Sequence, residues 1–279
     1  MTDGYEPGSG TFRWTPDMAC LLLALLVLIP TAAAAAEKVD VPVRGKTLTL
    51  TIYRPANNAP ARGTIVMGSG DVGWVGLAVT MAEELSAQGY VVAGINVRQY
   101  LAAFTSGKSH LQPPEVPGDY LLFRDTLKQR GLLVRPVVLS GMSEGAALAV
   151  LAASDAKNHA WIDGVITMGI PPTAELAWRW TDMGAWVTKH DADEPSFAPR
   201  DVVANVSPVP LYMIQSVKDE YVPKAEYERL NTTAREPKKL VLIAASNHRF
   251  TDRRPELGAA YLAGLAWIAQ QPPSRSAPR

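Results

Sequence analysis

The sequence of 279 residues predicts one α/β domain with a doubly wound, mostly parallel sheet and an antiparallel hairpin at its start. Between residues 63 and 271, short apolar runs alternate with longer helical patterns, as strands alternate with helices around a parallel sheet. Before them, residues 39–43 and 47–53 alternate apolar and polar side chains around Arg44-Gly45-Lys46, which is typical of a hairpin. A third observation is a strand, a tight turn with a central serine and a helix over residues 137–153.

Each later element follows from its length, its periodicity and the glycines and prolines that end it. We expect buried strands at 63–67, 90–97, 136–139, 162–170, 210–215 and 239–244. We expect helices at 77–88, 119–130, 146–153, 225–235 and 257–271. A long polar loop is expected at 98–118. Residues 173–207, rich in tryptophan, interrupt the alternation where a short cap insertion would lie. The domain therefore spans residues 37–271, and residues 272–279 form a disordered tail.

The first 36 residues have the pattern of a secretory signal peptide. Residues 20–29 are apolar but too few to span a bilayer as a helix. Small residues follow, and we expect cleavage after Ala36, giving a periplasmic or secreted protein. The segment before the apolar run is long and holds three acids and one arginine. Met18 is therefore an alternative start, and an uncleaved membrane anchor is an alternative interpretation of this segment.

Composition excludes several classes of protein. The chain has 27 basic and 27 acidic residues, which gives no support for a nucleic-acid partner. Its single cysteine, Cys20, lies in the predicted leader. The mature chain would therefore contain no disulfide framework, no cysteine nucleophile and no cysteine-based metal site. We expect neither a metal nor an organic cofactor.

The central turn reads Gly141-Met142-Ser143-Glu144-Gly145, a G-x-S-x-G pattern between an apolar strand and an alanine-rich helix. This is the context of a nucleophile elbow, in which a sharp, strained turn exposes the serine hydroxyl above the sheet. Glycines flank the serine because side chains there would clash. We predict Ser143 as a nucleophile. The alternative is a glycine-rich turn with an incidental serine.

A serine nucleophile needs a base, and the base needs an orienting acid. In doubly wound sheets, ligands meet the loops at the carboxyl ends of the strands. Of the four histidines, only His248 directly follows an apolar strand, and Asp219 follows the strand before it. The order Ser143, Asp219, His248 is one known order of a catalytic triad. Glu220 is the competing acid.

The oxyanion hole should combine the N–H of Glu144 with one N–H from the loop after an earlier strand. That loop is the glycine-rich stretch at 68–74, GSGDVGW, and we predict the N–H of Asp71, with Gly70 as the alternative. A phosphate-cradling loop is the other interpretation of such glycines, but the lysine and hydroxyl residue of a P-loop are absent.

These motifs resemble the α/β-hydrolase superfamily across residues 38–271. Over residues 68–147 the chain is similar to the VirJ/AcvB-type bacterial virulence hydrolases. That resemblance implies export to the periplasm and removal of the aminoacyl group from lysyl-phosphatidylglycerol. It places the nucleophile at Ser143 and the glycine-rich loop at Ser69, Gly70, Asp71, Gly73 and Trp74. Met142 and Glu144 depart from the usual pattern, in which an aromatic residue stands beside the serine. An acid beside the nucleophile would suit a cationic substrate.

Gly70, Trp74, Tyr100 and Trp178 are the predicted substrate-binding residues. The tryptophans of the cap, Trp178 with Trp180 and Trp186, would line an acyl or lipid pocket, or would only pack the cap on the core. A lipid ester substrate would bring the protein into contact with a membrane surface. Our main hypothesis is an exported serine hydrolase of carboxylic esters. The second is a non-catalytic periplasmic binding protein on the same fold, since fold alone does not define function.

Overall fold

The computed structural model describes Met1 and residues 36–179 and 194–272. The predicted signal peptide, apart from its two end residues, lies outside the described residues. So do Trp180 and Trp186 of the predicted cap and all but the first residue of the predicted tail. In the described ranges, no helix is both long and apolar enough to cross a membrane.

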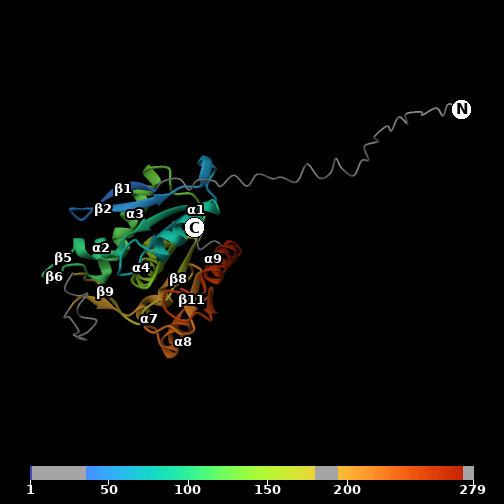
Figure 1. Cartoon of the computed structure of the whole chain (residues 1–279). Helices are drawn as coiled ribbons and strands as arrows, with labels where there is room; N and C mark the ends of the chain where they lie inside the picture. Colours follow the sequence, from blue (N-terminus) through green and yellow to red (C-terminus); the bar gives the residue numbers. More distant parts are fainter. Residues whose placement is uncertain (2–35, 180–193, 273–279) are drawn as a thin grey trace. The chain divides into compact units, whose positions relative to one another are not determined.

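An eight-stranded sheet organises the unit formed by residues 33–279 (Figure 1). In spatial order its strands are β1 (Glu37–Val43), β2 (Lys46–Tyr53), β4 (Val91–Ile95), β3 (Thr64–Gly68), β7 (Val137–Met142), β8 (Gly164–Met168), β11 (Leu211–Ser216) and β12 (Lys238–Ile243). β1 pairs antiparallel with β2, and β2 pairs antiparallel with β4. Every later neighbour is parallel. The predicted fold class is confirmed, including the hairpin at its start.

Helices cover both faces of the sheet because the parallel strands are buried on both sides. One face packs against α1 (Leu77–Ala87) and α9 (Arg254–Ala269). The other packs against α3 (Val116–Gln129), α4 (Glu144–Ala153) and α8 (Lys224–Thr233). Successive residues of β3 divide between the two layers, with Ile65 and Met67 in the first and Val66 in the second. This alternation follows from the two-residue period of a strand.

The connections contain short elements that the sequence pattern did not reveal. The stretch predicted as a polar loop holds α2 (Val97–Ala103), β5 (Thr105–Ser106), β6 (Lys108–Ser109) and η3 (Pro113–Glu115). α2 begins because the Asn96 side chain accepts a hydrogen bond from the N–H of Gln99 at 3.2 Å. Its buried residues Val97, Tyr100 and Leu101 have helical spacing. The remaining short elements are η2 (Ala56–Asn58), α5 (Ala156–His159), β9 (Ala174–Glu175), β10 (Ser196–Phe197), α7 (Pro199–Val202) and η4 (Val203–Val206).

The parallel strands end at one edge of the sheet, and this edge brings distant loops together. The loops after β3, β7, β8, β11 and β12 all leave the sheet there. Such an edge is where ligands bind in open α/β sheets. The predicted nucleophile, acid and base belong to three of these loops.

Candidate active site

Ser143 stands at the sharp turn between β7 and α4. Its φ angle of 51° lies in the left-handed region, which is strained for a residue with a side chain by about 1–3 kcal/mol. Its backbone N–H donates to the carbonyl of Met168 at 3.0 Å, and its carbonyl accepts from the N–H of Ala146 at 2.9 Å. These bonds hold the turn to β8 and begin α4. The geometry is that of a nucleophile elbow.

The glycines on either side of the serine are required by close backbone contacts. A Cβ atom on Gly141 would lie 2.2 Å from the carbonyl oxygen of Gly145. A Cβ atom on Gly145 would lie 2.4 Å from the carbonyl oxygen of Ser69. Any side chain at these positions would push apart β7, α4 and the end of β3. The predicted steric reason for the two glycines is confirmed. Because these positions carry no side chain, the loop after β3 can pack directly against the elbow.

The base and acid are paired as the sequence predicts. Nδ1 of His248 lies 2.7 Å from Oδ2 of Asp219. The Asp219 side chain has no exposed surface, and that of His248 is 12% exposed. Oδ2 of Asp219 also accepts from Nε2 of Gln215 at 2.7 Å. Its other oxygen accepts the N–H groups of Tyr221 and Val222 at 2.9 and 3.0 Å.

These hydrogen bonds control the charge of Asp219. Burial acts to raise the pKa of its carboxyl, but the hydrogen bond and charge of His248 and the two N–H donors outweigh burial. The pKa of Asp219 is therefore lowered, and the carboxylate stays ionised beside the imidazole. The competing acid, Glu220, has a different place. Its carboxylate accepts a hydrogen bond from the backbone N–H of His248 at 2.7 Å. Glu220 therefore fixes the loop that carries the histidine, whereas Asp219 binds the imidazole ring.

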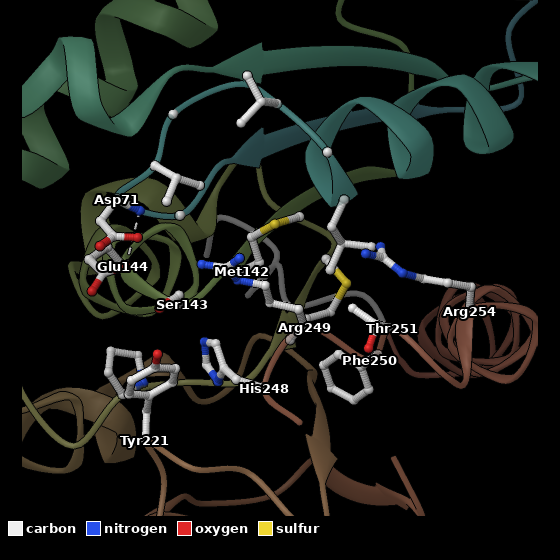
Figure 2. A pocket seen from close by; sticks show the side chains of 18 residues that line it. Asp71, Met142, Ser143, Glu144, Tyr221, His248, Arg249, Phe250, Thr251 and Arg254 are labelled. Atoms are coloured by element: carbon white, nitrogen blue, oxygen red, sulfur yellow. Dashed lines mark hydrogen bonds between the residues drawn. The ribbon is translucent and has the colours of Figure 1, made fainter. Parts of the chain in front are cut away.

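The imidazole of His248 is positioned by two further residues. Gly169, with a φ of 62°, lies so close that a Cβ atom there would come within 2.7 Å of Cε1 of the ring. The ring of Tyr221 meets the imidazole edge-on, with centroids 5.3 Å apart. Figure 2 shows the imidazole directed toward Ser143. In the described residues, the serine hydroxyl and this ring are not yet hydrogen-bonded; such contacts often tighten only when substrate binds.

Ser143 and His248 line a pocket of about 450 Å³. Its wall comes from residues 70–73 and 75–77 after β3, residues 142–144 at the elbow, Met168, Pro171, Tyr221, residues 248–251 and Arg254 (Figure 2). The pocket therefore opens over the predicted nucleophile and lies between the loop after β3 and the loop after β12. Gly70 lines it as predicted.

The predicted oxyanion donors lie beside the serine, and one of them already has an acceptor. The N–H of Asp71 donates to Oε2 of Glu144 at 3.3 Å (Figure 2). Burial raises the pKa of the Glu144 carboxyl, and the neighbouring Asp71 adds to the rise; nearby backbone N–H groups and the Ser143 hydroxyl act in the opposite direction. The side chain of Glu144 thus accepts a hydrogen bond from one of the two predicted oxyanion donors. Residue spacing alone carries no signal for this contact.

Three predicted substrate-binding residues are absent from the pocket lining, and the structure gives each another role. Trp74 donates from Nε1 to the hydroxyl of Tyr53 at 3.1 Å, and its ring fills the space left by Gly94. Tyr100 is 1% exposed and donates to the buried carboxylate of Asp119 at 2.6 Å.

The third is Trp178, whose ring lies under the guanidinium of Arg98, with 4.1 Å from its central carbon to the ring centroid. Trp178 packs against the core, as the alternative interpretation of the cap tryptophans held. An aromatic residue near a strand end in sequence is as able to fill a gap in the core as to face a ligand.

Other lining residues were not identified from the sequence. They are Met168, Pro171, Tyr221, Arg249, Phe250, Thr251 and Arg254, together with the small and apolar residues between Val72 and Leu77. The one sequence signal for some of them is their position, because residues 249–254 follow His248 directly in the chain. In the part of the chain that the structure describes, no group of three or more His, Cys, Asp or Glu side chains is placed to hold a metal ion.

Solved structures with the same arrangement are α/β hydrolases. The esterase domain of a Rhodothermus marinus protein is 18% identical, with 84% of this chain and 98% of that chain covered and a TM-score of 0.58. A putative dienelactone hydrolase from Klebsiella pneumoniae is 16% identical, with 85% and 98% covered and a TM-score of 0.64. The esterase Est1E from Butyrivibrio proteoclasticus is 15% identical, with 84% and 99% covered and a TM-score of 0.60. The chain has an α/β-hydrolase fold.

The family model of the bacterial virulence protein VirJ matches residues 63–261. The match covers well over half of the chain, so the chain belongs to the VirJ family. An uncharacterized protein of Escherichia coli, YfhR, is 35% identical over 66 residues. That alignment spans 23% of this chain and 23% of YfhR, so the similarity covers about a quarter of each protein.

Proposed function

We propose that this protein is an exported serine hydrolase that cleaves a carboxylic ester, with Ser143 as nucleophile, His248 as general base and Asp219 as orienting acid. The observation that carries the proposal is the paired His248 and Asp219, which lie 2.7 Å apart beside a serine held at a strained elbow. Strain of this kind is kept where a function requires it. The α/β-hydrolase fold of the neighbours and the VirJ family membership agree with this chemistry.

The proposed reaction has two halves. The Ser143 hydroxyl attacks the ester carbonyl while His248 takes its proton at Nε2, since Asp219 engages Nδ1. The C–O bond to the alcohol then breaks as His248 returns the proton to the leaving oxygen. Water, deprotonated by His248, hydrolyses the acyl-serine and restores the free enzyme. Asp219 stays ionised throughout because its lowered pKa favours the carboxylate.

Stabilising the negative oxygen requires one movement. The N–H groups of Glu144 and Asp71 are the proposed donors, and the latter is bound to the Glu144 carboxylate at 3.3 Å. A substrate oxygen reaches that N–H only when the carboxylate turns away. A turned carboxylate still leaves negative charge beside the acyl group. This charge, with that of Asp71, favours an acyl group that carries an ammonium ion.

We propose an aminoacyl-phospholipid ester as the substrate class, following the resemblance to the VirJ/AcvB-type hydrolases. Such a substrate places an ammonium ion next to the ester carbonyl, near Asp71 and Glu144. Its presence in a membrane would bring the protein to a membrane surface. Export of the chain by the predicted signal peptide belongs to the same proposal, and mass spectrometry of the exported protein tests it. A chain beginning after Ala36 is expected, and an intact N-terminus would contradict it.

Labelling with a fluorophosphonate tests the nucleophile directly. Wild-type protein should be labelled on Ser143 and should hydrolyse a p-nitrophenyl ester. The Ser143→Ala variant should lose labelling and at least about 10³-fold in kcat. Ser106→Ala, an exposed serine outside the pocket, is the matched control and should behave as wild type. Labelling at another serine would remove Ser143 from the proposed role.

A non-catalytic binding protein is the second candidate, and the contact between Asp71 and Glu144 favours it. A carboxylate on an oxyanion donor is not a ready catalytic arrangement. If this candidate is right, wild type and Ser143→Ala will be equally inert toward aryl esters and toward aminoacyl-phosphatidylglycerol. Both will then bind the same lipid vesicles with equal affinity.

A further inference from the structure

Arg254 is one of two pocket arginines, with Arg249, whose place the proposed reaction does not explain. It is the first residue of α9, and it lines the same pocket as Ser143 and His248. Figure 2 shows its side chain reaching from the start of α9 toward the interior of the pocket. It lies apart from Asp71 and Glu144, which occupy the elbow side of the same view.

The guanidinium of Arg254 has donors that the protein does not use. Its Nη1 is buried and, in the described part of the chain, has no hydrogen-bond partner. Burial lowers the pKa of this group, while the charge of Glu84 on α1 acts in the opposite direction without approaching to ion-pair distance. Arginine remains charged under such a shift. The side chain is partly exposed, but this one donor is buried, and a ligand in the pocket would supply the hydrogen-bond acceptor that the donor lacks.

The N-terminus of α9 adds a partial positive charge beside the guanidinium of Arg254. The N–H groups and the dipole at a helix N-terminus disfavour a nearby cation and attract an anion. The neighbouring Arg253 lies in the same field but pairs with Glu256 at 3.8 Å. Arg254 has no such ion pair in the described residues. An anion in the pocket would satisfy both the helix terminus and the guanidinium.

The wall of the pocket also includes apolar side chains. Leu77, Met142 and Phe250 are among its lining residues. An apolar chain would lose contact with water on entering it, which favours binding. The pocket thus combines a nucleophile beside acidic groups, an apolar wall and an unpaired guanidinium.

We infer that Arg254 forms an anion subsite, and that the preferred ester carries a carboxylate or phosphate group joined to the ester through an apolar chain. The assignment of the ester rests on the proposed function, whereas the binding of the anion does not. The guanidinium would form two parallel hydrogen bonds with such a group. Arg254 positions the substrate and takes no part in proton transfer.

Matched esters test the inference. We would compare p-nitrophenyl monoesters of dicarboxylic acids with p-nitrophenyl alkanoates of the same chain length, and would include a phosphonate-terminated ester to separate the two anion sources. Wild type should prefer one anionic series by about tenfold or more in kcat/KM. Arg254→Gln should lose that preference, chiefly through a higher KM for the anionic esters. Arg254→Lys should recover part of it, because charge remains while bidentate geometry is lost.

Arg253→Gln is the matched control, since it removes the same charge one residue away and lies outside the pocket lining. It should keep the preference of wild type. Circular dichroism and a thermal melt would show that Arg254→Gln is folded. If wild type hydrolyses neutral and anionic esters alike and Arg254→Gln changes neither, the anion subsite is overturned while the hydrolase proposal stands.

Binding without chemistry separates the two proposals. Titration calorimetry of Ser143→Ala with monomethyl suberate and with a phosphonate analogue should show binding that weakens about tenfold when Arg254→Gln is added. If that dependence is found but wild type hydrolyses no ester, the subsite stands and the hydrolase proposal fails. Equal binding by both proteins would overturn the subsite.

Discussion

Two carboxyl groups in the pocket region have opposite environments. Asp219, after β11, accepts hydrogen bonds from His248, Gln215 and two backbone N–H groups, and its pKa is lowered. Glu144, at the start of α4, is half-buried beside the negative charge of Asp71, and its pKa is raised. Burial alone would raise the pKa of both groups. The charge beside each carboxylate decides the difference: the neighbouring His248 lowers the pKa of Asp219, whereas the neighbouring Asp71 raises that of Glu144.

The difference assigns the two acids distinct roles in the proposed reaction. An ionised Asp219 can fix the tautomer of His248 and stabilise the imidazolium. Glu144 lies beside Asp71 and accepts the N–H of Asp71, a proposed oxyanion donor, so its charge would oppose the charge that the proposed reaction develops.

The largest effect is expected from Asp219→Asn. The amide would favour the wrong imidazole tautomer, so kcat on a p-nitrophenyl ester should fall by about 10⁴-fold while the fold is retained. Glu220→Gln is the matched control, because its side chain keeps an oxygen that can accept the N–H of His248. It should stay within about threefold of wild type. Equal losses in the two variants would show that the wrong acid was chosen.

Gly169→Ala should displace the imidazole that Asp219 holds. The added Cβ would lie 2.7 Å from the ring at a positive φ, so we expect kcat to fall by about 10–100-fold. Gly131→Ala is the matched control for backbone strain, since Gly131 has a φ of 66° but nothing within 4 Å of an added Cβ. Both variants should lower the melting temperature, and only Gly169→Ala should lower kcat. Steady-state kinetics and thermal melts separate the effect of backbone strain from the effect of moving the imidazole.

Glu144→Ala should free the N–H of Asp71 and remove the opposing charge. On neutral aryl esters kcat should rise by about threefold to tenfold, because one preorganised donor contributes strongly to oxyanion binding. Glu144→Gln removes the charge but keeps an acceptor near the N–H, so it should give a smaller rise. A fall in kcat for both variants would mean that the carboxylate assists the reaction.

The smallest effects should appear in stability against pH. The lowered pKa of Asp219 stabilises the fold above the ordinary pKa of an aspartate, near 4, and this contribution is lost as pH falls through the folded-state value. The raised pKa of Glu144 has the opposite sign, so its ionisation costs stability as pH rises from about 4 through its folded-state value. Urea unfolding from pH 3 to 8 should show Asp219→Asn less stable than wild type, with a gap that shrinks only below about pH 4. It should show Glu144→Gln more stable, with a gap that opens only above about pH 4.

The strands, the elbow and the acid–base pair could be predicted from the sequence because their signals are local. Gly141 and Gly145 mark the elbow, and His248 and Asp219 each follow an apolar strand. The parallel sheet converts these positions into proximity in space. Strand ends were displaced by only a few residues, since apolar runs mark the buried part of a strand and not its hydrogen-bonded limits.

The remaining features depend on contacts between distant segments. The ring of Trp74 packs where Gly94 leaves space, and no pattern in its own loop indicates that. The sequence predicts a loop where α2 forms, because the polar residues of α2 mask three buried positions with helical spacing. Arg254 is the first residue of α9, and it reaches the pocket only because the turn after β12 places the start of this helix there. The contact of Glu144 with Asp71 depends on a side-chain rotation, which residue spacing does not encode.

The contacts of Gly141 and Gly145 have a consequence for redesign. The backbones of β7, α4 and the end of β3 pack there without intervening side chains, so the nucleophile and the loop after β3 form one rigid unit. A library that varies residues within that unit would mostly yield misfolded or inactive chains. Residues 249–251 and 254 line the pocket and are not among the contacts of these two glycines, so new substrate preferences are best sought there by saturation mutagenesis.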